Sequence, residues 1–327
     1  MGDGRHLCDG RGGGARAQAR AGSGRHHEPR QDSSIRKPAG NLGLARVGGA
    51  AVQQHRQVRF EGKTVVVTGA SSGLGRQLAH EFARRGAQLV LFARGEERLR
   101  ETADECQKLG AAATLIVTGD VTQPQDCHRL VEQSLARFGG IDCFVANAGI
   151  SMWTRFADMD DATIFRRLIE TNFLGVVQCA QAALKPLQAR RGMLVVISSI
   201  QAKVGVPFHS GYSASKHALE GWVDALRCEF DGTGVEILKV YPHWLAGTRL
   251  RENAFGSDGQ PLGARKRSPS NSAITVELCA HKIAEAVAQR RQVLYVPWHL
   301  CFLPWLKLLM PGVLRRYIRG KVGHQES

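Results

Sequence analysis

Residues 63–86, with the sequence KTVVVTGASSGLGRQLAHEFARRG, decide the fold of this chain. The β-branched run that ends at Thr68 predicts a buried strand. From Leu74 onward, apolar residues recur at helical spacing and predict a helix that ends near Gly86. Three glycines stand between these elements, where a bare backbone can approach a pyrophosphate and the new helix offers it unpaired N–H groups. This order of strand, glycine-rich turn and helix predicts a dinucleotide-binding site.

The alternation of extended and helical patterns continues along most of the chain. Predicted strands cover residues 63–68, 88–93, 113–117, 141–146, 193–197 and 235–240. Predicted helices cover residues 74–86, 96–109, 124–138, 161–189, 212–230 and 274–288. Strands that alternate regularly with helices predict an α/β fold, a doubly wound parallel sheet (Rossmann fold) with helices on both faces. We expect residues 57–297 to form this single domain.

The two ends of the chain differ in composition from this body. The net charge is +15, and the excess of basic residues lies before residue 60 and after residue 260. The neutral body argues against a nucleic-acid-binding core. Residues 1–56 are rich in glycine and arginine and poor in large apolar residues, so we expect a disordered basic leader. The leader has no apolar run of a secretory signal; a mitochondrial transit peptide and translation from an upstream start are the two alternatives.

The 8 cysteines are scattered along the chain. No two of them are spaced as Cys-x-x-Cys, and most lie inside apolar periodic segments. This pattern indicates buried thiols in a reducing compartment. We therefore expect a cytoplasmic protein with neither a disulfide framework nor a metal site.

Polar residues follow the predicted strands at the edge where a parallel sheet binds its ligand. Asp120 comes after the third strand and Asn147 after the fourth. The second strand ends at Ala93, where dinucleotide-binding folds often carry an acid that binds the ribose 2′-hydroxyl. Since the acid is missing and Arg94 could bind a 2′-phosphate, the sequence predicts NADP(H) rather than NAD(H). A solvated Arg94 is the alternative, and Arg98 is a second candidate for the phosphate.

The segment 198–219 carries the candidate chemistry. A helix after Gly211 would place Tyr212 and Lys216 one turn apart on the same face. A phenol has an ordinary pKa near ~10, and an adjacent ammonium group lowers it, so the pair forms an acid unit. Ser199, at the end of the preceding apolar run, can point into the same space. Tyr-x-x-x-Lys pairs also occur by chance on helix surfaces, so the surrounding motifs decide.

In order and spacing, these motifs resemble the short-chain dehydrogenase/reductase family. The resemblance covers residues 60–296 and is nearest to NADP-using members that include steroid- and retinoid-type reductases. It implies a catalytic tetrad of Asn172, Ser199, Tyr212 and Lys216. The cofactor-binding residues that it implies are Gly69, Ser71, Ser72, Gly73, Leu74, Gly75, Arg94, Asp120, Val121, Asn147, Tyr212 and Lys216.

The resemblance also implies a reaction, hydride transfer between a nicotinamide and a carbonyl or secondary alcohol. Tyr212 would donate a proton to the carbonyl oxygen, Ser199 would donate a hydrogen bond to it, and Lys216 would lower the pKa of Tyr212 and hold the nicotinamide ribose. Asn172 would hold a proton-relaying water, and a helix-bending side chain is the alternative for this residue. A non-catalytic NADP-binding or scaffold protein on the same fold is the rival hypothesis.

One departure from the family pattern follows the sixth strand. The family has Pro-Gly there and then a threonine near the nicotinamide amide, whereas this chain has Pro242-His243 and places Thr248 one position late. We expect His243 to adopt a conformation that glycine adopts more easily. A structural substitution is favoured over a mechanistic role for this histidine.

The last part of the chain carries a predicted lid and a tail. Residues 249–271 are polar and contain glycine and proline, which predicts a lid over the substrate. In residues 298–327, an apolar and basic tail, tryptophans are followed by arginines, which fits a peripheral membrane contact. A flap over the pocket and a subunit contact fit equally, and prolines argue against a transmembrane helix. We expect a small hydrophobic carbonyl or alcohol as substrate, a homo-oligomer, and no nucleic-acid partner.

Overall fold

The structure of the chain, a computed structural model, describes residues 59–263 and 273–323. The predicted basic leader, residues 1–56, lies outside the described residues. So does the second part of the predicted lid, from residue 264 to residue 271.

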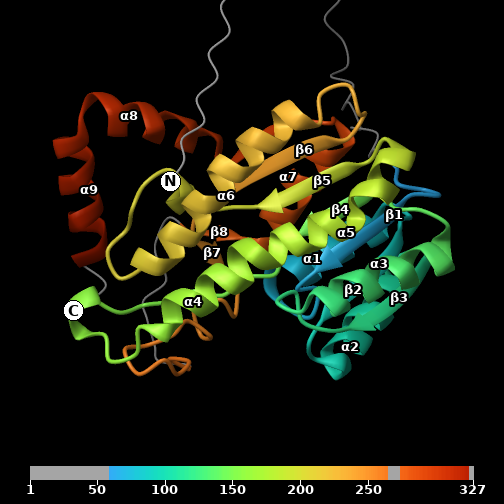
Figure 1. Cartoon of the computed structure of the whole chain (residues 1–327), viewed down its shortest axis with the longest axis horizontal. Helices are drawn as coiled ribbons and strands as arrows, with labels where there is room; N and C mark the ends of the chain where they lie inside the picture. The colour runs from blue at the N-terminus through green and yellow to red at the C-terminus, as the bar shows by residue number, and fades with distance from the viewer. Residues whose placement is uncertain (1–58, 264–272, 324–327) are drawn as a thin grey trace, which may run out of the picture. The chain divides into compact units, whose positions relative to one another are not determined.

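A parallel sheet of seven strands forms the centre of the described structure (Figure 1). Its strands are β1 Thr64–Thr68, β2 Gln88–Ala93, β3 Ala113–Thr118, β4 Cys143–Ala146, β5 Met193–Ile197, β6 Glu236–Pro242 and β9 Val293–Val296. Their order across the sheet is β3-β2-β1-β4-β5-β6-β9, and every neighbouring pair is parallel. The order changes direction between β1 and β4, and the carboxyl ends of the strands leave a ligand crevice at such a point. The predicted α/β fold is confirmed.

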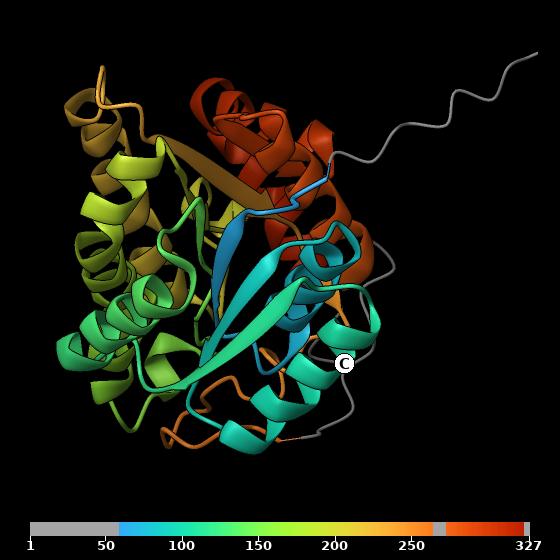
Figure 2. The same ribbon diagram turned by 90° about the vertical axis from the view of Figure 1, so that its right-hand side faces the viewer.

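Helices cover both faces of the sheet (Figure 2). One face carries α1 Gly73–Arg84, α2 Glu96–Lys108 and α7 Val276–Ala288, and the other carries α3 Pro124–Phe138, α5 Gly175–Arg190 and α6 Ser210–Glu229. Each face has its own buried cluster, so in β1 the side chains of Val65 and Val67 enter one cluster and that of Val66 enters the other. Because both faces are buried, the strands are apolar throughout instead of alternating with polar residues.

The edge strand β9 is the one strand of this sheet that the sequence patterns do not predict. Its four residues run directly into Pro297 and an apolar segment, so they show neither a period of two nor a turn signal of their own. The segment becomes a strand by pairing with β6, from Lys239↔Val293 to Pro242↔Val296. The prediction of six strands is therefore one strand short.

The predicted helix over residues 161–189 is interrupted. It begins as α4 Thr163–Ile169 and passes through a π-helical turn, η2 Glu170–Leu174, before α5 begins. Such turns replace the regular hydrogen-bond spacing locally and frequently mark functional positions. Asn172 lies inside this turn.

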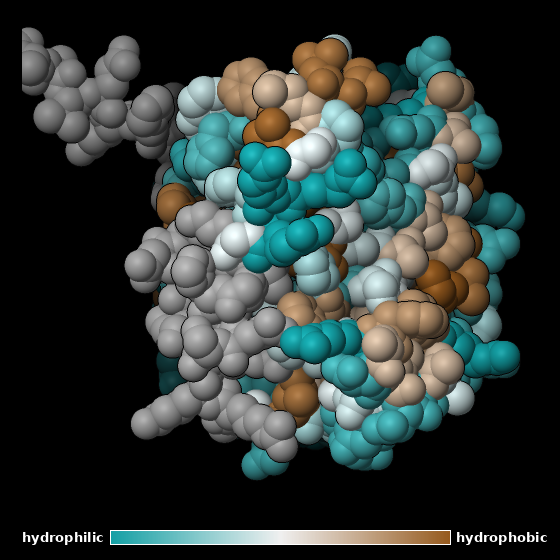
Figure 3. Space-filling view, turned by 90° about the vertical axis from the view of Figure 1, so that its left-hand side faces the viewer, coloured by the Kyte–Doolittle hydropathy of each residue, from teal (hydrophilic) through white to brown (hydrophobic). Residues whose placement is uncertain are grey.

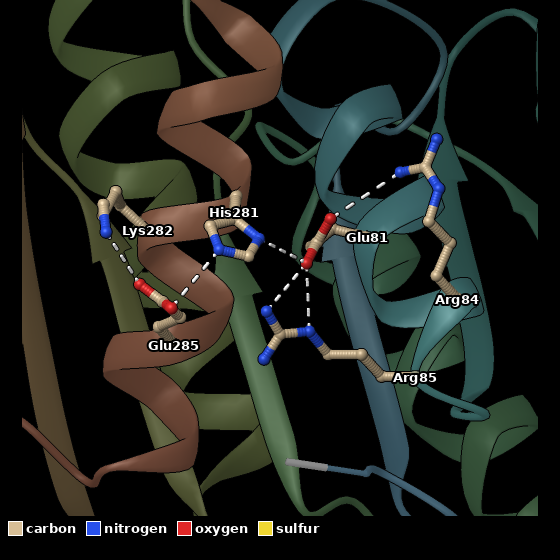
Figure 4. Close-up of polar contacts among 6 residues, drawn as sticks. All are labelled: Glu81, Arg84, Arg85, His281, Lys282 and Glu285. Carbon is tan, nitrogen blue, oxygen red and sulfur yellow. Dashed lines mark hydrogen bonds and ion pairs between the residues drawn. The ribbon is translucent and has the colours of Figure 1, made fainter. Parts of the chain in front are cut away.

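A group of polar side chains around the buried Glu81 joins α1 to α7 (Figure 4). The Glu81 carboxylate is 7% exposed and accepts hydrogen bonds from Arg85 Nε at 3.0 Å and Nη2 at 2.7 Å. The same carboxylate lies 3.0 Å from His281 Nδ1 on α7. Arg85 compensates the charge of the Glu81 carboxylate within α1, and the contact with His281 links α1 to α7.

The tail forms three short elements beyond the sheet edge, at the left of Figure 1: η4 Trp298–Phe302, α8 Leu303–Leu309 and α9 Pro311–Gly323. A small second sheet pairs β7 Leu245–Ala246 with β8 Ile274–Thr275. Within the described ranges, we find no helix with the length and apolar character needed to cross a membrane.

Candidate active site

A cavity of about 780 Å³ lies at the carboxyl ends of the strands. The predicted site residues that line it are Gly69, Ser71, Ser72, Gly73, Leu74, Arg94, Asp120, Val121, Asn147, Ser199, Tyr212 and Lys216. Gly75 and Asn172, the other two predicted site residues, do not line the cavity themselves. Motifs that are far apart in the sequence therefore meet in one space.

The glycine turn is built for close approach of a ligand. Gly69 has φ +66° and Gly73 has φ +53°, a conformation that residues with a side chain rarely adopt. A β-carbon at Gly75 would lie 2.2 Å from the Gly69 carbonyl oxygen, so only glycine lets the helix start this close to the strand. The Ser72 side chain makes no capping hydrogen bond, which leaves the N-terminus of α1 to an anion. The turn fits the diphosphate of a dinucleotide.

A threonine that sequence reasoning missed organises the neighbouring strand end. The Thr68 hydroxyl accepts hydrogen bonds from the backbone N–H of Asn147 at 3.0 Å and of Ala148 at 3.1 Å. Asn147 Nδ2 in turn donates to the Thr68 carbonyl at 2.9 Å. β1 and the loop after β4 are thus tied together under the cavity. The only sequence signal was a hydroxyl at the end of an apolar strand.

The end of the cavity beside β2 carries the candidate 2′-phosphate contacts. The Arg94 side chain is 76% exposed and its Nη1 lies 3.8 Å from Asp120 Oδ2, a loose ion pair that leaves the guanidinium accessible. Asp120 Oδ1 accepts a hydrogen bond from Thr122 N at 2.9 Å, which holds the carboxylate beside the cavity. Arg98 lines the same region.

Ser199 and Tyr212 meet on the opposite wall. Tyr212 is 7% exposed and lies in the first turn of α6. Ser199 Oγ accepts a hydrogen bond from Gln201 N at 3.2 Å, so its proton is free to point at the phenol. Burial raises the pKa of Tyr212 to about 12, and the hydrogen bond with Ser199 lowers it in part. The phenol therefore stays protonated at neutral pH.

Lys216 lies one turn further along α6, as predicted. Its ammonium group is 5.7 Å from the centre of the Tyr212 ring and donates to the Ile197 carbonyl at 2.9 Å. Burial lowers the pKa of Lys216 to about 8. The expected lowering of the Tyr212 pKa by this cation is not found: burial raises the pKa, and the hydrogen bond that lowers it in part comes from Ser199.

The Asn172 side chain links two walls of the site through hydrogen bonds. Its Nδ2 donates to the Ile150 carbonyl at 2.9 Å and to Ser215 Oγ at 3.0 Å, and its Oδ1 accepts from Ile150 N at 2.8 Å. Both amide protons are occupied by protein atoms. The side chain thus connects the loop after β4 to α6 from within the π-helical turn.

The backbone conformation of the segment after β6 differs from the one expected from the sequence. The non-glycine residues of the described chain with positive φ are Arg191, Phe208 and Arg290, so His243 is not in the left-handed conformation that favours glycine. The expectation for His243 is wrong, because its N–H donates to the Val296 carbonyl at 2.9 Å and prolongs the pairing of β6 with β9. Thr248 lines the cavity, and a β-carbon at Gly73 would lie 3.6 Å from its Cβ.

Beyond Tyr212 the cavity wall is aromatic. Trp153 stacks on Phe208 with ring centres 5.1 Å apart, and the buried His209 meets Trp153 edge-on at 4.9 Å. Trp244 lies 5.3 Å from His209 on the other side. The tail completes this end of the cavity with Leu303, Leu314, Tyr317 and Ile318. No motif marks Trp153, His209 and Trp244, which come from three separate segments, whereas a flap over the pocket was one of the alternatives for the tail.

A glycine turn, a dinucleotide-sized cavity and a Ser-Tyr-Lys wall on a doubly wound sheet define a class of nucleotide-dependent oxidoreductases. The profile of a family described as short chain dehydrogenase matches residues 63–258. The chain belongs to this family.

Known relatives place the chain among hydroxysteroid dehydrogenase homologues. It is 36% identical over 257 residues to 11-beta-hydroxysteroid dehydrogenase A of Arachis hypogaea, covering 77% of this chain and 73% of that protein. It is 34% identical to hydroxysteroid 11-beta-dehydrogenase 1-like protein A of Xenopus laevis, covering 79% of this chain and 86% of that protein. Family membership makes this chain an oxidoreductase of the NAD(P)-dependent kind that acts on CH–OH groups.

A solved structure shares the fold. An alcohol dehydrogenase from the archaeon Thermococcus sibiricus, complexed with 5-hydroxy-NADP, superposes with a TM-score of 0.59 at 27% identity. The match covers 71% of this chain and 95% of that one.

Proposed function

We propose that this protein is an NADP(H)-dependent reductase of an apolar ketone, and in reverse a dehydrogenase of the matching secondary alcohol. The observation that carries the proposal is the buried Tyr212 phenol, hydrogen-bonded to Ser199 with Lys216 beneath its ring, on the wall of the cavity. A phenol that stays protonated at neutral pH is an acid ready to donate.

Each residue of the wall has one task. When bound, the nicotinamide cofactor supplies or takes up hydride. Tyr212 gives its proton to the carbonyl oxygen while Ser199 donates a hydrogen bond that stabilises the charge developing there. The Lys216 ammonium stabilises the phenolate left behind. Asn172 holds α6 and the loop after β4 in register, so that these groups meet.

The preference for NADP(H) is supported by the charge around β2. Arg94 and Arg98 both line the cavity, and Ala93 stands where an acid would repel a 2′-phosphate. The structural relative bound to 5-hydroxy-NADP supports the same choice.

An apolar substrate is supported by the aromatic wall and by the tail residues that line the cavity. The named activity of the hydroxysteroid dehydrogenase relatives supports a bulky ring system at this end. Such a substrate gains its binding from burial of apolar surface against Trp153 and Trp244.

The test replaces Tyr212 by phenylalanine and follows NADPH consumption with a panel of ketones. We expect turnover to fall about 10²- to 10⁴-fold while the NADPH dissociation constant stays the same. Tyr295→Phe, on β9 and outside the cavity lining, is the matched control and should keep full activity. Turnover by Tyr212→Phe equal to that of the wild type would overturn the mechanism. NADPH binding by a wild type that reduces no ketone would favour the scaffold alternative.

We further propose that the tail rests on a membrane surface, with the protein in the cytoplasm. Large apolar side chains face outward from η4 and α8, including Trp298 at 70% exposed, Trp305 at 63% and Leu309 at 72%. Arginines 315, 316 and 319 follow on α9. Figure 3 faces this side, where hydrophobic surface lies next to hydrophilic surface. Tryptophan beside arginine suits the headgroup region of an anionic bilayer.

Vesicle sedimentation tests this surface. The wild type should sediment with phosphatidylglycerol vesicles, and the double variant Trp305→Ala/Leu309→Ala should stay in the supernatant. Phe156→Ala, which removes an equally exposed ring outside the tail, is the control and should sediment like the wild type. If the double variant changes only the elution volume in gel filtration, the face is covered by a second copy of the chain and the membrane proposal fails.

A further inference from the structure

Arg251 places a half-buried cation at the substrate end of the cavity. It lines the cavity, and its guanidinium carbon lies 4.4 Å from the centre of the Trp244 ring. Its Nη2 is buried and has no hydrogen-bond partner among the described residues. Burial lowers the pKa of Arg251, although a guanidinium remains charged at any physiological pH. The Trp244 face attracts the cation but offers no acceptor.

The other cations of this region are already engaged. Arg167 donates to the Gly259 carbonyl at 3.2 Å and lies 4.0 Å over the Phe255 ring. Arg249 pairs with Glu252 at 3.6 Å. A buried N–H donor without an acceptor costs stability, so a site that keeps one is arranged for an acceptor that arrives with the ligand.

The acids that line the cavity do not supply that acceptor. Asp120 lies at the opposite end, beside Arg94, and accepts the backbone N–H of Thr122. Glu170 lines the cavity from the π-helical turn but makes no ion pair with Arg251 in the described structure. In the described structure, neither acid that lines the cavity therefore forms an ion pair with Arg251.

Arg251 is connected to the reacting group by a row of rings. Its guanidinium carbon is 4.4 Å from Trp244, Trp244 is 5.3 Å from His209, and His209 is 6.2 Å from Tyr212. A ligand whose carbonyl meets Tyr212 would lay its apolar body along these rings and bring its far end to Arg251.

We propose that Arg251 binds a carboxylate of the substrate, so that the substrate is an apolar keto acid or the matching hydroxy acid. This inference rests on the proposed function, since it assigns the far end of the same substrate. A carboxylate is the planar acceptor that a guanidinium binds with two parallel hydrogen bonds. The diphosphate of the cofactor is the other anion to consider, and the glycine turn and the N-terminus of α1 already fit it.

A pair of ligands that differ only in charge tests the inference. Binding of 9-benzoylnonanoate, a keto acid with a chain long enough to follow the rings from Tyr212 to Arg251, and of its methyl ester is measured by tryptophan fluorescence in the presence of saturating NADP⁺, so the readout does not need turnover. We expect the wild type to bind the acid about tenfold more tightly than the ester. Arg251→Gln should abolish this preference and Arg251→Lys should keep part of it. Arg249→Gln, which removes the neighbouring paired cation, should retain it.

Each result bears on one hypothesis. A wild type without preference for the acid overturns the inference, whether or not the variants fold. A weaker NADPH affinity in Arg251→Gln, with the preference for the acid unchanged, assigns the cation to the cofactor and also overturns it. Loss of the preference with NADPH affinity unchanged supports it. A wild type that prefers the acid but reduces no ketone would keep the carboxylate site and sink the proposed function instead.

Discussion

The two ends of the cavity are built in different ways. At the cofactor end the ligand-facing surface is mostly main chain: a glycine turn, the N-terminus of α1 and strand ends tied by the Thr68 hydroxyl. At the substrate end it is made of side chains, with Trp153, His209, Trp244 and Arg251 drawn from segments that the fold alone brings together. A surface of main chain needs a few residues without side chains at fixed spacing. A surface of side chains can be assembled from almost any sequence.

This difference indicates which end of the cavity tolerates amino-acid substitutions. At the cofactor end one added carbon meets backbone, which cannot move aside. At the substrate end a changed ring meets other rings, which repack, and the result is a changed ligand preference. The two ends should therefore respond to substitution in separable ways.

The largest effect should come from Gly75→Ala. The new β-carbon would lie 2.2 Å from the Gly69 carbonyl oxygen and 2.6 Å from Asn147 Nδ2. We expect the free energy of unfolding to fall by about 3 kcal/mol, because β1 and α1 must move apart. Urea denaturation measures it. Gly221→Ala in α6, where the added carbon has no neighbour within 4 Å, is the control and should be neutral or stabilising. An equal decrease in the free energy of unfolding of the two variants would contradict the prediction that the glycine turn is rigid.

Arg94→Ala should rank second. Loss of a charged contact to a 2′-phosphate should raise the Michaelis constant for NADPH by about 10- to 100-fold and leave that for NADH nearly unchanged. Arg100→Ala, an exposed arginine paired with Glu96 on α2, is the control and should change neither constant. Should Arg94→Ala affect both cofactors alike, Arg98 becomes the candidate for the phosphate.

Lys216→Met should separate stability from activity. Burial lowers the pKa of Lys216 from 10.5 to about 8, so between these values the unfolded chain binds more protons than the folded one. Burial of the charged Lys216 therefore lowers the free energy of unfolding in full below pH 8. This destabilisation decreases as the pH rises from 8 to 10.5. We expect the variant to be more stable than the wild type by about 1 kcal/mol at neutral pH, with the gap closing towards pH 10.5.

Urea denaturation without cofactor, at pH 7 and at pH 10, measures this gap. Ketone reduction by Lys216→Met should be lost at both pH values. A gap that widens with pH would show that the cost of burying Lys216 has the opposite sign.

Trp153→Leu should have the smallest effect. It removes the ring stacked on Phe208 but keeps an apolar side chain, so the Michaelis constant for a ring-containing ketone should rise about threefold. The dissociation constant for NADPH should not change. If the dissociation constant for NADPH rose more than the Michaelis constant for the ketone, the two ends of the cavity would not bind separate ligands.

The sequence signals for the glycine turn and for the Tyr212-Lys216 pair are local. Gly69 and Gly73 are required by their own backbone angles, and Tyr212 and Lys216 share a face because a helix turns once in four residues. The substrate end has no such signal. Trp153 and Trp244 are ordinary apolar residues until β4 and β6 bring their loops together, and β9 is a strand only because β6 lies beside it. At His243 the sequence pattern predicts a backbone constraint that the structure does not have. The family pattern has glycine there, but the backbone of this chain accommodates histidine without a positive φ.

The position of α8 and α9 in the chain has a consequence for when the site becomes complete. The ribosome delivers the glycine turn, the seven strands and Lys216 before the helices that carry Leu303 and Leu314. A nascent chain can therefore assemble the strands β1 to β6 and the glycine turn while the tail residues that line the cavity are still inside the exit tunnel. The tail residues Leu303, Leu314, Tyr317 and Ile318 are thus the last part of the cavity wall to be added.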